Sequence, residues 1–466
     1  MIYIKGRFVP IFIPLLFVAG TIYKGFHEYR AGRRFIVKNY MNPEKVFYTP
    51  LAFYGGDTWD YILPALQLYK IGKPEFLIDG EYFLFCRRNP TTYLIFTLFW
   101  VFGKYMPVVF VFLVSLLFSV LLYIFYSILM ELEFNKFLLI FSGIVYLPYW
   151  IERVSRIMME GLVSIIALII MIVYLNDIKK GAKLYISKYL LPLSVLSFIR
   201  GEFLIVLIFY LFFMLYYRYK NKDRITGFSI FAITLSIVLF IWNIHWVRTC
   251  GETSGIWEWG YRNIIKVKYN YSYNKIRQHE EKLNNKIIKN LSNKKIYDKS
   301  YKFFIIHHSF PYYNNGVNLK KSQIFDLILK NDNLRLYILY RILLRNPYLF
   351  IFAQPSGSFV SMIKARIRYF NIIYHIWGIV VIISIICIFI QIFVKKDKIG
   401  IFVLMTYFII MIIYDAYYFA GGAHFSRFKS FYSFLEIMVV YLSFRNTKIT
   451  NKSTLFNNLG KDTRIE

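Results

Sequence analysis

The chain has 466 residues, of which 58% are hydrophobic and 21% aromatic, and it carries a formal net charge of +31. Its mean hydropathy of +0.47 is above that of an ordinary water-soluble fold, and several apolar runs are long enough to cross a bilayer. Composition therefore excludes a soluble domain and predicts an all-α polytopic membrane protein, because helices close their backbone hydrogen bonds within each apolar run. The alternating pattern of an outer-membrane barrel is absent from the sequence.

The basic charge comes from 57 Lys and Arg residues against 26 Asp and Glu residues. These basic residues are scattered between apolar runs, which argues against nucleic-acid binding, because that function needs one basic patch. Attraction to anionic lipid head groups or to a phosphate-bearing substrate is one interpretation of the charge. Biased composition is the other, since Ile, Lys, Asn, Tyr and Phe are abundant throughout. The positions of the basic residues along the chain are therefore more informative than the total charge.

Ten apolar runs are expected to span the membrane. The run at 91–103 has too few residues for a comfortable crossing, so we expect it to form a re-entrant or interfacial helix instead. The expected spans are 8–23, 106–130, 137–150, 161–176, 186–199, 203–217, 226–247, 375–394, 399–418 and 431–444.

The basic connecting segments predict the orientation, because short loops rich in Lys and Arg face the cytoplasm. With ten crossings, five basic segments fall on one side: the N-terminus, 177–188, 218–224, 395–398 and the tail. If 91–103 also crossed, the loop at 177–188 would be forced outside. We therefore expect a multi-pass protein of the inner (cytoplasmic) membrane with both termini in the cytoplasm. The segments expected outside are 24–105, 151–160, 200–202, 248–374 and 419–430.

This topology divides the chain into four parts. An N-terminal membrane module at 1–247 carries the first outer loop at 24–105, and a long extracytoplasmic region follows at 248–374. The C-terminal membrane helices occupy 375–445, and a cytoplasmic tail covers 446–466. A disulfide between Cys86 and Cys250, each in an expected outer segment, is one option that the sequence leaves open.

Ionisable residues gather at the expected outer ends of the spans. Charges so close to hydrocarbon are costly unless they are paired or functional, so they are candidates for a site. Each also has a structural interpretation: solvated loop carboxylates, an acid at a helix N-terminus, local ion pairs, or arginines at the interface. The candidates are Asp57, Asp60, Glu160, Arg200, Glu202, Arg248, His424 and Arg427.

Acids and guanidinium groups on one outer face suit the transfer of a group from a lipid phosphate. A carboxylate acts as general base on the acceptor, and arginines bind the leaving phosphate. A second acid would orient the acceptor or hold a divalent cation. We therefore expect Asp57, Asp60 and Glu160 to be the catalytic carboxylates. The expected donor phosphate-binding residues at these span ends are Arg200, Arg248, His424 and Arg427.

The first outer segment resembles the first-loop pattern of the GT-C superfamily. Its motifs are Asp57-Thr58-Trp59-Asp60-Tyr61, Arg87-Arg88-Asn89-Pro90 and Phe102-Gly103. Further matches in the same order are Glu160, Trp246-Val247-Arg248-Thr249, Arg345-Asn346-Pro347 and His424-Phe425-Ser426-Arg427-Phe428. These integral-membrane glycosyltransferases include aminoarabinose transferases and protein O-mannosyltransferases, and they use polyprenyl-phosphate sugars.

The resemblance implies a GT-C-like fold and catalysis by Asp57, with Arg87 or Arg88 on the donor phosphate. It implies a polyprenyl-phosphate-linked sugar as donor and a glycan, lipid or protein as acceptor. Thr58 stands where the family often has Glu, with Asp60 two residues later. This departure leaves open which carboxylate is the base, and whether Mg²⁺ or Mn²⁺ binds at Asp57 and Glu160.

Two other functions remain as alternatives. An O-antigen-type polymerase or ligase would depend on Arg and His residues of 248–374 and not on Asp57. A flippase or transporter of lipid-linked glycans would show internal repeats, broken helices and charges at mid-membrane. We see no repeat in the sequence, and the charges considered above lie at the outer boundary, so the transporter ranks third.

Overall fold

The structure is a computed structural model of the chain. The residues that it describes are 2–30, 35–39, 42–49, 65, 77–78, 81–82, 89–154, 156–157, 159–179, 187–199, 203–221, 230–231, 233–238, 241, 343–344, 346–366, 370–395, 398–417 and 425–459.

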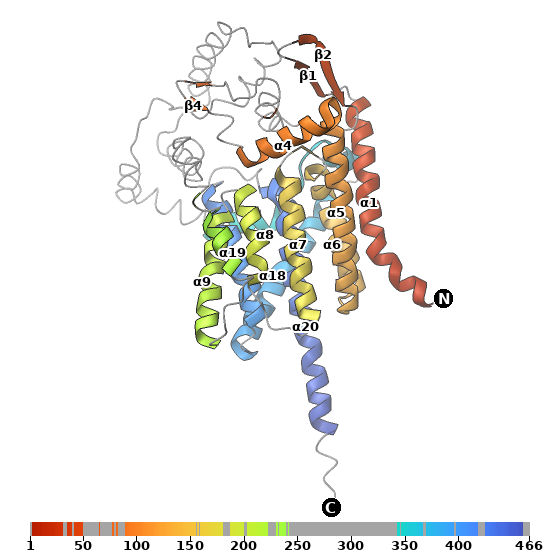
Figure 1. The fold of residues 1–466 in the computed structure, drawn as a ribbon. Coiled ribbons are helices and arrows are strands. Elements are labelled where there is room, and N and C mark those ends of the chain that lie inside the picture. The colour runs from red at the N-terminus through yellow and green to blue at the C-terminus, as the bar shows by residue number, and fades with distance from the viewer. Residues whose placement is uncertain are drawn as a thin grey trace, which may run out of the picture.

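A bundle of long helices forms the body of the described protein (Figure 1). Nearly every expected apolar run lies in one of these helices; of the run at 226–247, only parts are described. The helices are α1 (Ile2–Arg30), α4 (Asn89–Phe102), α5 (Met106–Glu131), α6 (Lys136–Arg153), α7 (Met159–Lys179), α8 (Ser187–Ile199), α9 (Leu204–Asn221), α16 (Asn346–Phe352), α17 (Ser358–Arg366), α18 (Phe370–Lys395), α19 (Lys398–Tyr417) and α20 (Phe425–Leu459).

Four helices of the described chain are long and apolar enough to cross a membrane. These segments are Val9–His27, Met106–Glu131, Met159–Lys179 and Phe370–Val394. Two shorter apolar helices are Tyr93–Phe102 and Gly400–Ile412. The prediction of a helical, membrane-embedded protein is therefore confirmed.

Two short antiparallel strand pairs lie within the expected first outer loop, and the sequence analysis did not predict them. Strand β1 (Phe35–Asn39) pairs with β2 (Asn42–Thr49), and β3 (Leu77–Ile78) pairs with β4 (Glu81–Tyr82). The longer pair contains Ile, Val, Phe and Tyr, which favour strands. The pairs add to the helical fold and leave the bundle itself unchanged.

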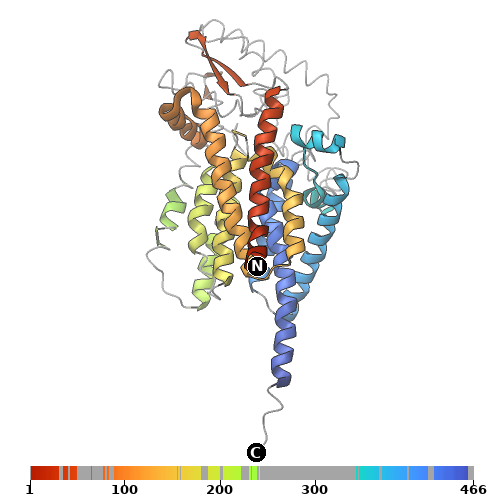
Figure 2. The same cartoon turned by 90° about the vertical axis from the view of Figure 1, so that its right-hand side faces the viewer.

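Helix α4 lies across one end of the bundle. Figures 1 and 2 place it where α1 ends and α5 begins. The chain turns from α4 into α5 through a single 3₁₀ turn at Gly103–Tyr105, where Gly103 has a φ of +51° that glycine adopts without strain. Ile95 and Phe99 are buried on one side of α4, while Trp100 is 73% exposed. Helix α4 therefore does not run in line with the long helices (Figures 1 and 2), and a re-entrant or interfacial place for 91–103 stays a prediction.

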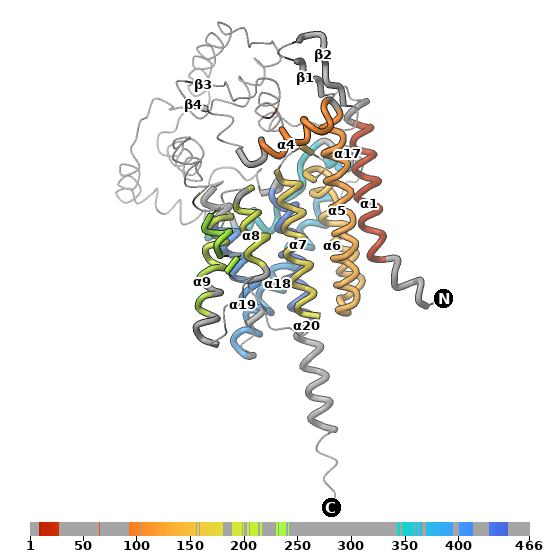
Figure 3. The backbone as a smooth tube through the Cα atoms, viewed as in Figure 1, coloured from red at the N-terminus to blue at the C-terminus, as the bar shows by residue number. Residues whose placement is uncertain are grey.

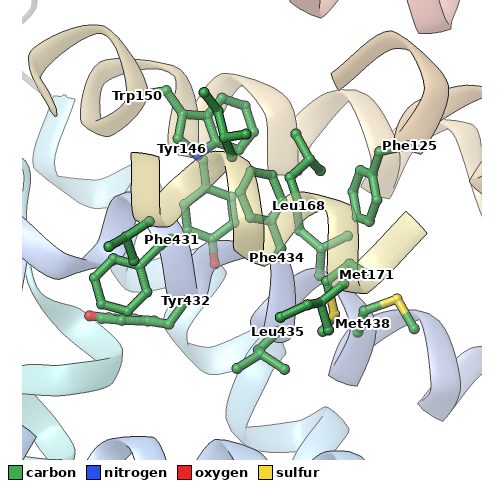
Figure 4. Close-up of a cluster of buried hydrophobic side chains, with 14 of the residues drawn as sticks. Phe125, Tyr146, Trp150, Leu168, Met171, Phe431, Tyr432, Phe434, Leu435 and Met438 are labelled. Carbon is green, nitrogen blue, oxygen red and sulfur yellow. The ribbon is translucent and has the colours of Figure 1, made fainter. Parts of the chain in front are cut away.

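Helix α6 lies at the centre of the bundle and contacts α1, α5, α17, α18 and α20. Its Trp150 stacks on Phe434 of α20, with ring centroids 5.4 Å apart, and Phe118 of α5 packs against both rings. Figure 4 shows this aromatic core, with side chains from α5, α6, α7 and α20 filling the space between the helices. The Tyr and Trp side chains of α6 pack against the neighbouring helices, whereas Phe137 and Ile144 of the same helix are exposed.

Helix α20 is the longest helix of the described chain, and it continues past the end of the bundle (Figure 1). Every residue from Phe428 to Ser443 is buried. Its neighbours α6, α7, α18 and α19 surround this part. The expected last span at 431–444 is thus a core helix of the bundle, and the first part of the expected tail continues the same helix.

Candidate functional site

Most of the predicted site lies outside the described residues. Glu160 is described in full, and Arg427 lies in α20 but its side chain is outside the described part. The residues outside the described part are Asp57, Asp60, Arg87, Arg88, Arg200, Glu202, Arg248 and His424. The catalytic and phosphate-binding roles expected for them stay predictions.

Glu160 is fully buried in the first turn of α7. An acid at this position interacts favourably with the helix dipole, so part of its role is structural. Ser164, one turn later, donates its hydroxyl to the Glu160 carbonyl at 2.6 Å. The same hydroxyl oxygen lies 3.3 Å from the hydroxyl oxygen of Ser430 in α20. Glu160 therefore begins its helix beside the start of α20.

The ends of four helices meet around Ser430 and Phe431. The Trp150 indole, near the end of α6, donates to the Ser430 carbonyl at 3.0 Å. Phe203, immediately before α9, packs edge-on against Phe431 with ring centroids 5.6 Å apart. With α7 joined through Ser164, the helix ends that flank 151–160, 200–202 and 419–430 come together. These are three of the five segments that the sequence predicts on one outer face.

Glu152, a residue that the sequence analysis missed, forms a buried ionic cluster near the end of α6. Its Oε2 lies 2.9 Å from the Arg156 guanidinium and 3.7 Å from the ammonium of Lys24 in α1. Lys24 also donates to the Ile151 carbonyl at 3.2 Å. A carboxylate that is buried as deeply as Glu152 needs basic partners, because the loss of its hydration is costly.

The electrostatics of Glu152 favour its ionised form. Burial alone would raise the pKa of the carboxyl, but Lys24, Arg156 and Arg153 lower it, as does a hydrogen bond from the Phe359 backbone N–H. The balance holds the pKa below its ordinary value. Glu152 is therefore an anion at neutral pH, and its negative charge attracts the three basic side chains around it.

A second buried ion pair, also missed, lies deeper in the bundle. Glu436 of α20 accepts hydrogen bonds from the hydroxyls of Tyr146 and Tyr407, and its Oε2 lies 3.6 Å from the Lys429 ammonium. The Trp377 indole of α18 donates in turn to the Tyr146 hydroxyl. Each of these side chains is at most 2% exposed. One carboxylate thus joins α6, α18, α19 and α20.

The sequence does carry a signal for the second of these clusters. Glu436 is the one acid within the apolar run 431–444, and Lys429 stands seven residues earlier, on the same side of a helix. The sequence analysis treated charges as a feature of the outer boundary, and Glu436 shows that this view was incomplete. Arg156, which follows α6, forms its ion pair with Glu152.

The described residues include no group of three or more His, Cys, Asp and Glu side chains that would hold a metal ion. Glu160 is the described member of the expected Asp57 and Glu160 cation site. Comparisons of the chain with protein-family models, with curated proteins and with solved structures found no match.

Proposed function

We propose that the protein is a membrane glycosyltransferase of the GT-C type that moves a sugar from a polyprenyl-phosphate donor to an acceptor on the extracytoplasmic face. The acceptor is a glycan, a lipid or a protein. Asp57 is the general base, and the predicted arginines bind the donor phosphate. The donor's lipid tail stays in the bilayer while its sugar reaches the outer end of the bundle.

In this reaction the Asp57 carboxylate takes the proton of the acceptor hydroxyl or amine as that group attacks the anomeric carbon of the sugar. A new bond forms between the acceptor atom and the anomeric carbon. The bond from this carbon to the phosphate oxygen breaks, and its electron pair leaves with the polyprenyl phosphate. Guanidinium groups stabilise the charge that builds on the leaving phosphate.

The observation that carries the proposal is the meeting of helix ends at Ser430 and Phe431. The beginning of α7 with Glu160, the beginning of α9 and the beginning of α20 lie together there. Three segments with predicted acids or arginines attach to these ends, so a shared site is within reach of all three. Helix α4, which follows Arg87 and Arg88 in the chain, lies across one end of the bundle (Figure 1).

The finer topology belongs to the same proposal: ten crossings, a GT-C-like arrangement, and both termini in the cytoplasm of a cell with the protein in its inner membrane. Helices α6, α8, α9, α19 and α20 and the run at 226–247 would cross in addition to the four apolar helices. Each of these five helices is shorter or more polar than those four. Support comes from the bundle itself, since α1 begins and α20 leaves at the same end (Figure 1).

The test is transfer by the purified protein in liposomes, with a panel of polyprenyl-phosphate sugars and Asp57→Asn as the variant. We expect the wild type to transfer one donor sugar and Asp57→Asn to lose transfer by roughly a hundredfold or more, as for a general base. Asp60→Asn is assayed in parallel, because the sequence leaves open which of the two carboxylates is the base. Unchanged transfer by Asp57→Asn would overturn the role of this carboxylate. Loss in Asp60→Asn alone would move the role to Asp60.

One observation favours a transporter of lipid-linked glycans as a second candidate. The Lys429–Glu436 pair is a buried charge pair inside the bundle, at the level of Tyr146 in α6 and Tyr407 in α19. Charges within the membrane often mark transport pathways. A liposome assay that shows movement of a lipid-linked sugar across the bilayer without transfer would favour this candidate over the transferase.

A further inference from the structure

Residues 346–366 form a strap: helix α16, a break at 353–357, and helix α17. Helix α17 contacts α1, α6 and α18, and Figure 3 shows it beside α1 near the end of the bundle. Pro355 explains the break, because it has no N–H to donate and disfavours helical geometry in the residue before it. An interruption leaves carbonyl groups without partners at the end of α16 and N–H groups at the start of α17.

The bundle supplies hydrogen-bond donors for the carbonyls of α16. The Tyr432 hydroxyl donates to the Phe350 carbonyl at 2.9 Å, and the Lys429 ammonium donates to the Ile351 carbonyl. The Tyr149 hydroxyl donates to the carbonyl of Ala353, just past the helix. A cation at a helix C-terminus is also favourable to the helix dipole. Lys429 therefore completes α16 while it remains paired with Glu436.

Glu152 supplies the acceptor for α17. Its Oε1 accepts from the backbone N–H of Phe359 at 2.6 Å and of Val360 at 3.3 Å. Its Oε2 faces Arg156 and Lys24. An anion at a helix N-terminus is favourable to the dipole. The two ends of the break thus receive charges of opposite sign, each of the sign that its helix end favours.

Gly357 makes this close approach of the strap to Glu152 possible. Its φ is +144°, a conformation that other residues rarely adopt. A Cβ atom at this position would also overlap the Glu152 carboxylate. The break is therefore shaped to this one side chain.

We propose that Glu152 and Lys429 are positioning residues that hold the strap at the end of the bundle where the proposed transfer site lies. They touch no substrate, and they act through the position of α16 and α17. The catalytic consequence rests on the proposed glycosyltransferase function, whereas the holding of the strap does not. Loss of the Glu152 carboxylate would free the start of α17 from α6 and leave α5 and α7 in place.

The experiment is hydrogen–deuterium exchange of the full chain in nanodiscs, with Glu152→Gln and Gly357→Ala. We expect exchange in 353–366 to rise by about ten- to hundredfold in both variants, because charge-assisted hydrogen bonds are lost or displaced. Exchange in α5 and α7 should stay at the wild-type rate. The matched control is Glu131→Gln, which removes the exposed pair with Lys179 at 2.5 Å and should leave the strap unaffected.

Transfer assays on the same variants separate the two parts of the inference. We expect kcat to fall at least about tenfold as the strap loosens, by analogy with small displacements of positioning groups. Wild-type strap exchange in both variants, or a rise spread equally over α5 and α7, would overturn the proposal. A loosened strap with full transfer would overturn the positioning role. A loosened strap in a protein that transfers no sugar even as wild type would remove the proposed function and leave the holding of the strap supported.

Discussion

At the residue scale, Glu436 and Lys429 form a unit with more than one role. The carboxylate accepts from Tyr146 and Tyr407, and the ammonium reaches both the carboxylate and the end of α16. Removing one partner of a buried pair leaves an uncompensated charge, while replacing both by apolar residues of similar size is often tolerated. The two side chains should therefore be strongly coupled in their effect on stability.

We predict that Glu436→Gln and Lys429→Met will each lower the free energy of unfolding by roughly 3–5 kcal/mol, as for other broken buried pairs. The double variant with Glu436→Gln and Lys429→Met should cost less than the sum of the two. The measurement is reversible unfolding in detergent micelles, analysed as a double-mutant cycle. Glu131→Gln with Lys179→Met provides the exposed reference pair, for which we expect a coupling below about 1 kcal/mol. Additive effects at 429 and 436 would contradict the buried pair.

At the element scale, α4 differs from the other apolar helices in direction and not in composition. Ile95 and Phe99 are buried, whereas Trp100 and Val101 are more than half exposed. Its apolar length, Tyr93–Phe102, is too short for a crossing. Helix α4 lies across the bundle, whereas α5 runs along it. Apolar residues of the two helices should therefore lie at very different depths in a bilayer.

We predict that a spin label at Val101 will lie near the lipid head groups and that one at Leu117, part-way along α5, will lie deep in the hydrocarbon. Leu117 is twelve residues into α5, which corresponds to about 17 Å along a helix axis. Power saturation with oxygen and a water-soluble nickel chelate measures both depths in liposomes. Leu117 is 48% and Val101 56% exposed, so the labels are comparable in steric terms. Equal depths would contradict the crosswise placement of α4.

The apolar runs predict the helices well, because membrane burial is readable from local composition. The run 106–130 matches α5, and 161–176 lies inside α7. Local composition carries much less information about contacts between residues that are distant in the chain. Glu152 and Phe359 are 207 residues apart, and Tyr146 and Glu436 are 290 residues apart. The sequence therefore predicted a membrane bundle, but not the buried clusters around Glu152 and Glu436.

At the scale of the whole molecule, the successive helices α5, α6 and α7 run in alternating directions. Helix α5 ends at Glu131, where Lys179 of α7 meets it, and α6 leads from there to the cluster around Glu152. The two turns that flank α6 therefore lie at opposite ends. The length of α6, 18 residues or about 27 Å, is close to the thickness of a hydrocarbon core.

We predict that reporters fused after Glu133 and after Ser155 will appear on opposite sides of the membrane, with Glu133 in the cytoplasm and Ser155 outside. Paired fusions of a fluorescent protein and a periplasmic phosphatase make the measurement. The control is a fusion after Arg445, which the proposed topology places in the cytoplasm. A cytoplasmic signal from Ser155 would contradict the orientation on which the outer site depends, whereas a signal from the same side at both turns would contradict a crossing by α6.

The separation of Tyr146 from Glu436 has a consequence for biosynthesis. A ribosome adds roughly 5–20 residues per second, so the 290 residues between these partners take about 15 to 60 seconds to make. During that interval α6 exists without α20, and the Trp150 ring lacks the Phe434 ring on which it stacks in the finished protein. The early helices must therefore wait in a provisional arrangement. Helix α20, which is made after the helices that surround it, is the one that closes the core.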